Sequence, residues 1–549
     1  MTDKKIFYLK LVIFILLLAW FGFLMAEKID LTTADLGRHL KNGEIILSQG
    51  LKMGEANTVL DSNFYSYTNQ DYPFVNHHWA SGVVFFLIYE LAGFSGLSIS
   101  YIFLSVLIFS IAFYIACRES NFTVAAILSI LLIPLMAERR EIRPEIFSYF
   151  FAVVFFLLLW LWSRKKISVR WLFLLPILMI FWVNFHIYFF LGLFIIGVFL
   201  VSEIGGTIFS RLTDDAFEEK IQKIKRLFAL FFLSFAATFL NPSGLAGAIH
   251  PFNVYKNYGY TVAEEKSVWF VENYGIVNSN YLLIKAVLIL IILSFILLFV
   301  LNRKKIFAPY LMLAVFFGAI GLAQIRNFTL FGFFVLPILA SNFENIFTPS
   351  RKDNLPAKEN GLALMYIAVF LVAIYANFQF VSLHRGNRGV GLLPGNESAA
   401  DFLRNEKIAG PIFNNYDIGG YLIWNLPENE KVFVDNRPEA YPDSFFSGVY
   451  KPMQENPDIF KKIDQQYNFN TVVFSRNDIT PWGMNFLKMI KEDQGWAPVF
   501  EDTYAVIYLK KNEISQPIIE KYAGTAGSSN NYRWLEQKNK RRHSRRFLE

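Results

Sequence analysis

The sequence predicts an α-helical polytopic membrane protein with about eleven transmembrane helices and a C-terminal extracytoplasmic α/β domain. Three observations support this fold class. Apolar runs long enough to cross a hydrocarbon core of about 30 Å recur between residues 6 and 382. Short basic clusters separate these runs. From about residue 383, helical and strand patterns alternate in the manner of a compact α/β domain.

The composition excludes an ordinary soluble protein. Of the 549 residues, 54% are hydrophobic and only 18% are charged. The net charge of +7 does not indicate nucleic-acid binding, because the positive charge lies in short clusters between apolar runs. The single cysteine, Cys117, excludes an intrachain disulfide framework and a cysteine-based metal site.

The basic clusters set the orientation of the spans. Placing all of them on the cytoplasmic face gives a self-consistent alternation, with a cytoplasmic N-terminus and an extracytoplasmic C-terminal domain in the cell (inner) membrane. The clusters are residues 4–5, 164–166, 303–305 and 351–352, joined by the amphipathic stretch 211–226. The expected spans are 6–26, 97–116, 122–138, 146–163, 171–185, 187–204, 227–241, 279–301, 307–324, 328–346 and 362–382. The first run is longer than a signal-peptide core and lacks a clear cleavage site, so it is expected to be a retained helix.

Three regions follow from this pattern. Residues 1–382 form the membrane domain, with a long outer loop at 27–79 and an interfacial helix at 80–93. Residues 383–512 form the α/β domain, and residues 513–549 are a polar, basic tail expected to be disordered. In the α/β domain the predicted strands are 411–413, 421–424, 431–435, 471–474 and 504–509, and the predicted helices are 401–407 and 457–467. Asp435 and Arg437 are expected to form a surface ion pair, and 417–421 is a turn rather than a nucleotide-binding fingerprint.

The outer loop carries the first candidate site residues. Asp35, Arg38 and His39 lie within about one helical turn, just past the first span. Thr33 could cap a short helix that places Asp35 and His39 on one face. Asp35 is then either a general base or metal ligand at the membrane surface, or one half of a solvated pair with Arg38 or His39.

The loop closes on a histidine pair and a tryptophan. Trp79 suits an interfacial anchor. Because adjacent side chains point in different directions on most backbones, at most one of His77 and His78 is expected to meet a substrate or metal. A divalent metal held with Asp35 and His39 stays open, although no ligand spacing such as His-Glu-x-x-His is present.

Three arginines stand on the outer side of the membrane, where the charge rule predicts few. Arg139, Arg140 and Arg143 lie between two spans, and their guanidinium groups could bind the phosphate of a lipid-linked substrate. The alternative is an internal network with Glu138, Glu141 and Glu145. Arg326, in a further outer turn, is another candidate phosphate contact.

Two more outer segments carry polar or aromatic groups. His186 follows Asn184 at a tight turn between two spans, where it faces a cavity or pairs with a buried neighbour. The outer loop 242–278 contains tyrosines and a tryptophan that either stack on sugar rings or anchor the loop at the interface.

Together these segments resemble the GT-C superfamily of integral-membrane glycosyltransferases, in particular bacterial relatives of protein O-mannosyltransferases and the aminoarabinose transferase. The resemblance spans most of residues 1–512. It rests on residues 34–43, 61–68, 77–79, 143–144, 182–186, 241–244, 419–421 and 434–437. The superfamily's acidic residue in the first outer loop is matched by Asp35. Its second acid, at a later outer turn, could be matched only by Glu141 or Glu145, among arginines.

The resemblance implies an inverting transfer of a sugar from a polyprenyl-phosphate donor to a glycan, lipid or protein acceptor on the outer face. Asp35 would be the catalytic base, and the arginines would hold the departing lipid phosphate. The candidate substrate-binding residues are Arg38, His39, His77, His78, Arg139, Arg140, Arg143, His186 and Arg326. The alternatives are a non-catalytic glycan-binding or assembly component of an envelope polysaccharide system, and a transporter or flippase. Ionisable residues that gather at the outer ends of helices rather than near the bilayer midplane favour transfer over transport.

Overall fold

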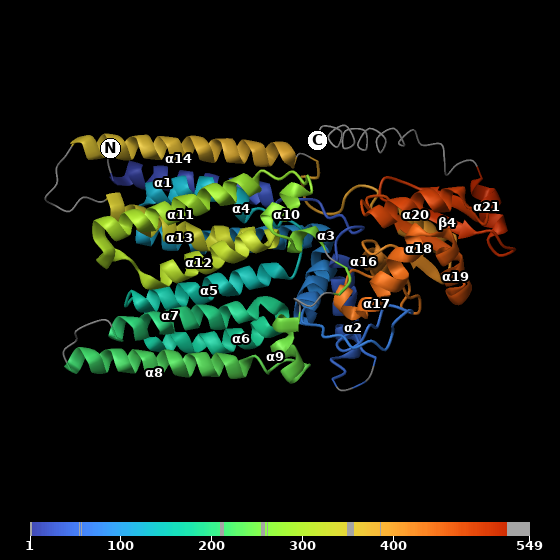
Figure 1. The fold of residues 1–549 in the computed structure, drawn as a ribbon, viewed down its shortest axis with the longest axis horizontal. Helices are drawn as coiled ribbons and strands as arrows, with labels where there is room; N and C mark the ends of the chain where they lie inside the picture. Colours follow the sequence, from blue (N-terminus) through green and yellow to red (C-terminus); the bar gives the residue numbers. More distant parts are fainter. Residues whose placement is uncertain are drawn as a thin grey trace.

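A computed structural model describes residues 3–53, 55, 57–208, 214–253, 258–260, 262–347, 356–384 and 386–523. It contains a bundle of long helices and a smaller α/β domain at one end of that bundle (Figure 1). Helix α2 (Leu36–Gln49) lies where the two parts meet and contacts both α3 (Trp79–Glu119) and α16 (Gly419–Asn425).

Each of the eleven predicted spans corresponds to a helix among the described residues. Seven helical segments are long and apolar enough to cross a membrane, and three shorter apolar helices lie among them. The eleventh, α8, joins the predicted amphipathic stretch and the following span into one helix. The bundle helices are α1 (Asp3–Met25), α3, α4 (Phe122–Met136), α5 (Glu145–Ser163), η1 (Val169–Phe173) with α6 (Leu174–Phe185), η2 (Ile187–Phe189) with α7 (Phe190–Ile208), α8 (Asp214–Ala237), α11 (Asn280–Asn302), η4 (Arg303–Lys305), α12 (Ala308–Ala323), η5 (Ile325–Asn327) with α13 (Phe328–Phe347), and α14 (Pro356–Leu383). The predicted multi-pass membrane fold is confirmed.

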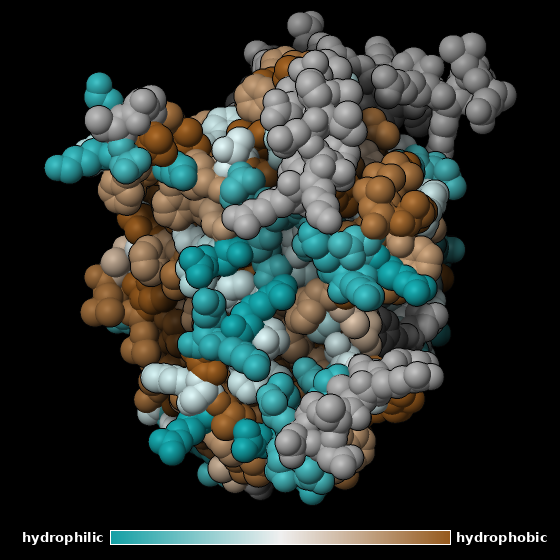
Figure 2. Space-filling view, turned by 90° about the vertical axis from the view of Figure 1, so that its left-hand side faces the viewer, coloured by the Kyte–Doolittle hydropathy of each residue, from teal (hydrophilic) through white to brown (hydrophobic). Residues whose placement is uncertain are grey.

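The end of the bundle remote from the α/β domain has a polar cap. Figure 2 looks onto this end and shows hydrophilic side chains gathered across it, with hydrophobic side chains along the flanks. A polar end above an apolar flank is the pattern expected where helices leave a hydrocarbon layer.

Helix α3 is broken at the end of the predicted interfacial segment 80–93. Gly93 has φ 61° and ψ −163°, so the segment before it is a helix that turns sharply into the following span. The break lies where the sequence pattern placed it. The interfacial position of the segment before Gly93 stays a prediction.

Glycines allow α2 to pack tightly on both sides. A Cβ atom at Gly37 would collide with the backbone carbonyl of Gly420 in α16, and one at Gly43 would collide with the carbonyl of Gly82 in α3. The first outer loop also pairs with the C-terminal part through an isolated bridge between Ser66 and Val432. The helix that carries Asp35 is therefore fixed between the bundle and the α/β domain.

The α/β domain contains a four-stranded sheet in the order β1-β2-β4-β3. Strands β1 and β2 are parallel, whereas β4 is antiparallel to both of its neighbours. The strands are β1 (Ile412–Asn414), β2 (Thr471–Ser475), β3 (Trp496–Glu501) and β4 (Ala505–Lys510). The helices around it are α15 (Ser398–Asn405), α16, η6 (Pro438–Ala440), α17 (Asp443–Phe445), η7 (Phe446–Tyr450), α18 (Lys451–Glu455), α19 (Pro457–Tyr467), α20 (Pro481–Glu492) and α21 (Gln516–Tyr522).

Several predictions for this domain were wrong. Residues 421–424 are helical, because they belong to α16, whose first turn packs against α2. Residues 431–435 form a single bridge rather than a strand, and β3 was not predicted. The tail predicted from residue 513 begins with a helix, α21, and residues 524–549 lie outside the described residues.

The predicted surface pair of Asp435 and Arg437 is also wrong, because both side chains are buried. Arg437 donates two hydrogen bonds to Asp435, at 2.7 and 2.6 Å, and one to Asn63 of the first outer loop, at 2.8 Å. Its guanidinium lies over the rings of Tyr65 and Phe74. This ion pair therefore ties the first outer loop to the α/β domain.

Candidate active site

Asp35 occupies the N-cap position of α2, but its carboxylate does not cap the backbone. Instead, Oδ2 lies 3.3 Å from Nε2 of His39 and 3.4 Å from Nη2 of Arg38. The expected i, i+4 relation of Asp35 and His39 is present, with Asp35 rather than Thr33 at the cap. Because the carboxylate only accepts hydrogen bonds, we assign the His39 proton to Nε2.

Three atoms of this first turn are buried and have no hydrogen-bond partner. They are Oδ1 of Asp35, Nη1 of Arg38 and Nδ1 of His39. Buried polar atoms are rarely left unpaired in a folded protein, and exceptions often mark a ligand-binding position. The turn therefore offers an acceptor and a donor to a polar ligand.

Positive charge keeps Asp35 ionised. Burial by itself would raise the pKa of Asp35, but the charges of Arg143 and Arg38 and the hydrogen bond from His39 hold that pKa well below its usual range. Burial and the neighbouring Arg38 lower the pKa of His39, so its imidazole is neutral at neutral pH. Arg143 thus acts on Asp35 from a segment about a hundred residues later in the chain.

Five of the seven histidines in the sequence gather beside Asp35. Ring centroids are separated by 5.3 Å between His39 and His78, by 3.7 Å between His78 and His77, by 4.7 Å between His77 and His250, and by 5.2 Å between His78 and His186. The rings of His77 and His78 lie against each other, so the two side chains do not point in different directions as expected; that at most one of them meets a substrate or metal stays a prediction. We call these five residues the histidine row.

Specific contacts orient two rings of the row, and burial lowers the pKa values within it. The Ser148 hydroxyl receives a bond from Trp182 at 2.7 Å and donates to Nδ1 of His186 at 2.8 Å. Nδ1 of His77 donates to the carbonyl of Val75 at 3.1 Å. Burial, followed by the charges of neighbouring groups, lowers the pKa values of His77 and His78 well below the ordinary value.

The arginines form an internal network with carboxylates, which is the alternative that the sequence left open. Arg139 donates to both oxygens of Glu145, at 2.9 and 3.0 Å, and to Glu264 at 2.6 Å. Arg143 donates to Glu141, at 2.9 and 2.7 Å, and to Glu264 at 3.2 Å. Burial would raise the pKa of Glu264, but Arg139 and Arg143 hold it well below the usual range.

The other two candidate arginines pair separately. Arg326 donates to Glu265 at 2.7 Å. Nη1 of Arg140 lies 3.2 Å from Glu27, and its Nε is buried without a hydrogen-bond partner. Arg140 is therefore bound less fully by protein groups than Arg139 or Arg143.

Sequence patterns missed three residues of the site. His250 and Glu264 come from the outer loop after α8, which contains α9 (Gly244–Asn253), η3 (Ala263–Glu265) and α10 (Val268–Asn273). Asp417 comes from the turn before α16, and burial and the carboxylates of Asp478 and Glu141 raise its pKa to about 7. The charge of Arg143 lowers the pKa of Asp417, so this carboxyl also lies within the electrostatic range of the arginine network.

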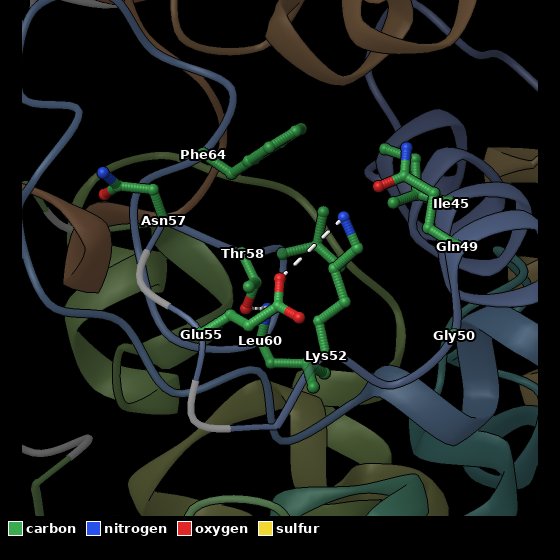
Figure 3. A pocket seen from close by; sticks show the side chains of 10 residues that line it. Ile45, Gln49, Gly50, Lys52, Glu55, Asn57, Thr58, Leu60 and Phe64 are labelled. Carbon is green, nitrogen blue, oxygen red and sulfur yellow. Dashed lines mark hydrogen bonds and ion pairs between the residues drawn. The ribbon is translucent and has the colours of Figure 1, made fainter.

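Two of the pockets lie at different ends of α2. One, of about 140 Å³, is lined by Thr33, Ala34 and Leu36 on either side of Asp35, and by Arg140 and Glu141. The other, of about 90 Å³, lies beyond the C-terminal end of α2, and Figure 3 shows Lys52 and Glu55 beside Gln49 there. The first pocket adjoins the candidate catalytic carboxylate, whereas the second lies at the opposite end of the helix.

The side chains of the site do not form a metal centre. In the described parts of the chain, no group of three or more His, Cys, Asp or Glu residues is arranged to hold a metal ion. The carboxylate of Asp35 accepts a hydrogen bond from His39, one member of the histidine row, and so orients the imidazole of that residue. The divalent metal that the sequence left open therefore stays a prediction, for which the described residues show no site.

Comparison with known proteins identifies the fold. No protein-family model and no curated protein matches the sequence. The oligosaccharyltransferase of Archaeoglobus fulgidus tethered to an acceptor peptide superposes with a TM-score of 0.59 at 13% identity, covering 92% of this chain and 74% of that one. The oligosaccharyltransferase AglB of the same organism, with an inhibitory peptide and dolichol-phosphate, gives 0.57 at 12% identity over 93% of this chain and 75% of that one.

A bacterial transferase has a similar structure over nearly its whole length. ArnT from Cupriavidus metallidurans bound to undecaprenyl phosphate gives a TM-score of 0.50 at 14% identity, covering 93% of this chain and 99% of that one. Both neighbours are GT-C glycosyltransferases. The chain therefore has the GT-C fold, a bundle of membrane helices with a C-terminal α/β domain, as the sequence resemblance implied.

Proposed function

We propose that this protein is a membrane glycosyltransferase that moves a sugar from a polyprenyl-phosphate donor to an acceptor on the outer face of the cell membrane. The observation that carries the proposal is the state of Asp35. Its carboxylate is held ionised by three cationic or hydrogen-bonding neighbours, while Oδ1 is buried without a protein partner. Such an oxygen is placed to accept the proton of an acceptor hydroxyl.

The reaction is an inverting displacement. The acceptor oxygen forms a bond to the anomeric carbon as the bond from that carbon to the phosphate oxygen breaks, and the electron pair leaves with the lipid phosphate. Oδ1 of Asp35 takes the hydroxyl proton. His39 holds the carboxylate in place through Nε2, and Arg38 offers its unpaired Nη1 to the sugar or the acceptor.

Arg143 is the best-placed group for the departing phosphate. It lowers the pKa of Asp35, and its partner Glu141 is 52% exposed, so a phosphate can displace that carboxylate at moderate cost. Fixed cationic donors that meet charge as it develops commonly contribute more to such catalysis than any other single effect. Arg139 is bound by the buried Glu145 and the partly buried Glu264, and serves to position Glu264 and Arg143.

Phosphate binding would also tune the base. In the free protein Arg143 depresses the pKa of Asp35, and a strongly acidic carboxyl is a weak proton acceptor. A lipid phosphate beside Arg143 compensates part of that positive charge, so the pKa of Asp35 rises when the donor binds. Asp35 is therefore a stronger base in the donor complex, where it accepts the proton of the acceptor hydroxyl.

The structural neighbours support a lipid-linked donor and a separate acceptor. AglB is described with dolichol-phosphate and ArnT with undecaprenyl phosphate, and the oligosaccharyltransferase is described with an acceptor peptide. A lipid-phosphate donor also suits a site at the membrane surface. A glycan, lipid or protein acceptor would then reach Asp35 through the pocket lined by Thr33, Ala34 and Leu36.

The test is sugar transfer by the purified full chain from a panel of polyprenyl-phosphate sugars, compared with Asp35→Asn. We expect the variant to lose about a hundredfold or more in turnover, the usual contribution of a general base. Asp401→Asn is the matched control, because Asp401 is exposed in α15 and pairs with Arg404, far along the chain from the site. Transfer by Asp35→Asn at the wild-type rate would exclude Asp35 as the base, and no transfer from any donor by the wild type would contradict the proposed function.

A further inference from the structure

A second cavity opens beside the pocket near Asp35, at the outer ends of the first and last bundle helices. It has a volume of about 210 Å³ and is lined by Glu27, Arg140, His384, Asn387 and Arg388. Glu27, Arg140 and Asn387 also line the pocket that reaches the residues on either side of Asp35. We call the cavity the outer port.

Backbone pairing builds the port into the fold. The residues that leave α1 pair with those that follow α14, through hydrogen bonds from Lys28 N to the Asn387 carbonyl at 2.7 Å and from Gly389 N to the Ala26 carbonyl at 3.2 Å. Farther down the helices, Trp20 donates to Asn377 at 2.7 Å. The walls are therefore fixed by the chain itself.

The port has donors that no protein group uses. Nε of Arg140 and Nη2 of Arg388 are buried and, within the described structure, have no hydrogen-bond partner. Glu27 is the only carboxylate among the described residues that line the cavity, so two guanidinium groups face one acid. Burial and the charge of Arg140 lower the pKa of Arg388, which means that the two cations repel each other.

A bound anion would compensate the repulsion between the two guanidinium groups. Two guanidinium groups with free N–H donors match the oxygens of a phosphate, which can accept several charge-assisted bonds at once. A neutral sugar would leave the like charges uncompensated.

The surroundings indicate that the anion belongs to a lipid. Arg140 lies over the ring of Phe380 in α14, and Arg388 lies over the ring of Phe23 in α1. Both helices contain segments long and apolar enough to cross a membrane, and Phe23 and Leu383 at their outer ends are 47% and 46% exposed. An amphiphile could therefore place its chain along these helices with its headgroup in the port.

We propose that the outer port binds the phosphate group of a membrane lipid through Arg140 and Arg388. The port differs from the pocket near Asp35 in its lining, because Leu383, His384 and Arg388 line only the port, whereas Thr33, Ala34 and Leu36 line only that pocket. Glu27, Arg140 and Asn387 line both cavities, so a lipid bound in the port lies directly beside the pocket near Asp35.

The proposal is tested with farnesyl phosphate as the probe and thermal stabilisation of the detergent-purified full chain as the readout. We expect farnesyl phosphate, but not farnesol, to stabilise the wild type. Arg388→Gln should weaken the apparent affinity about tenfold, the usual effect of losing a charge-assisted bond. Arg404→Gln, an exposed arginine of α15, is the matched control and should bind as the wild type does.

Glu27→Gln gives a change of opposite sign, which a folding defect would not produce. Removing the one lining carboxylate should tighten binding of farnesyl phosphate severalfold, because the cations are then less compensated. Unchanged affinity in both Arg388→Gln and Glu27→Gln, or equal stabilisation by farnesol, would overturn the proposal.

Two further arms identify the source of the phosphate. Competition by phosphatidylglycerol in nanodiscs, with none by phosphatidylcholine, would show that anionic membrane lipid fills the port and supports the proposal. Inorganic phosphate that stabilises as well as farnesyl phosphate at equal concentration would contradict a lipid ligand. Asp35→Asn should keep wild-type binding in this assay, so that failure of the port and failure of the transfer function are seen separately.

Discussion

Oδ2 of Asp35 lies 3.3 Å from Nε2 of His39, one helical turn along α2, and this contact fixes the orientation of the carboxylate. The other oxygen is left for a ligand. The pair stands where the membrane bundle meets the α/β domain, so both parts of the chain determine its position.

The first prediction concerns the donor that His39 supplies. In His39→Gln the side-chain amide can still donate to Asp35, whereas in His39→Leu it cannot. We expect the glutamine variant to keep most of the transfer rate and the leucine variant to lose about tenfold in kcat, since a bond to a charged group is worth about 1.5–3 kcal/mol. Initial-rate kinetics on both variants measure this, and equal losses would show that the imidazole ring itself is needed.

The second prediction concerns the close packing of α2. In Gly37→Ala the new methyl group meets the carbonyl of Gly420, so α2 must move away from α16. We expect a lower midpoint of thermal unfolding, a cost of about 1–3 kcal/mol, and reduced transfer. Gly448→Ala is the control, because a Cβ there meets no atom within 4 Å. Wild-type stability and rate in Gly37→Ala would contradict the packing account.

The third prediction concerns the buried ion pair between Asp435 and Arg437. Arg437→Ala leaves Asp435 buried without its cation and should cost about 3–5 kcal/mol. The first outer loop should then become more sensitive to protease, because Arg437 also bonds Asn63. Adding Asp435→Leu to Arg437→Met should restore much of the stability, since no unpaired charge remains; a double variant as unstable as Arg437→Ala would argue against this explanation.

The fourth prediction concerns pH. Asp417 has an ordinary pKa of 3.8 and a pKa of about 7 in the folded protein, so between these values the folded chain holds a proton that the unfolded chain has lost. Its contribution to stability is therefore largest below pH 3.8 and falls as the pH rises toward 7. The Asp417→Asn variant has no titratable group at this position, so its stability does not fall with rising pH for this reason. The unfolding midpoint of the variant, relative to that of the wild type, should rise as the pH increases from about 3.8 to about 7 and level off above that, and a difference independent of pH would contradict the assignment.

Much of the bundle could be predicted from the sequence, because apolar runs and basic clusters report directly on membrane helices. The acidic position at the start of α2 was also predictable, since Asp35 follows the first span closely. Residues 421–424 were assigned to a strand because a short apolar, aromatic run does not distinguish strand from helix. Their helical state depends on contact with Gly37, which lies nearly four hundred residues earlier and leaves no local signal.

The candidate site was predicted only in part for the same reason. His39, His77 and His78 lie close together in the sequence, but His186 and His250 join them through the folding of separate outer segments. For the arginines the sequence left open both phosphate binding and an internal network with glutamates. Glu264, from a loop more than a hundred residues away, occupies Arg139 and Arg143 in the folded protein. A charge pattern read along the chain does not reveal such a partner.

Removal of the acceptor proton by Asp35 is best examined by single-turnover transfer with the donor already bound. We expect Asp35→Asn to bind the polyprenyl-phosphate sugar at least as tightly as the wild type does, yet to transfer it at least about a hundredfold more slowly. A single-turnover rate within a fewfold of the wild type would contradict the role of Asp35 as the base.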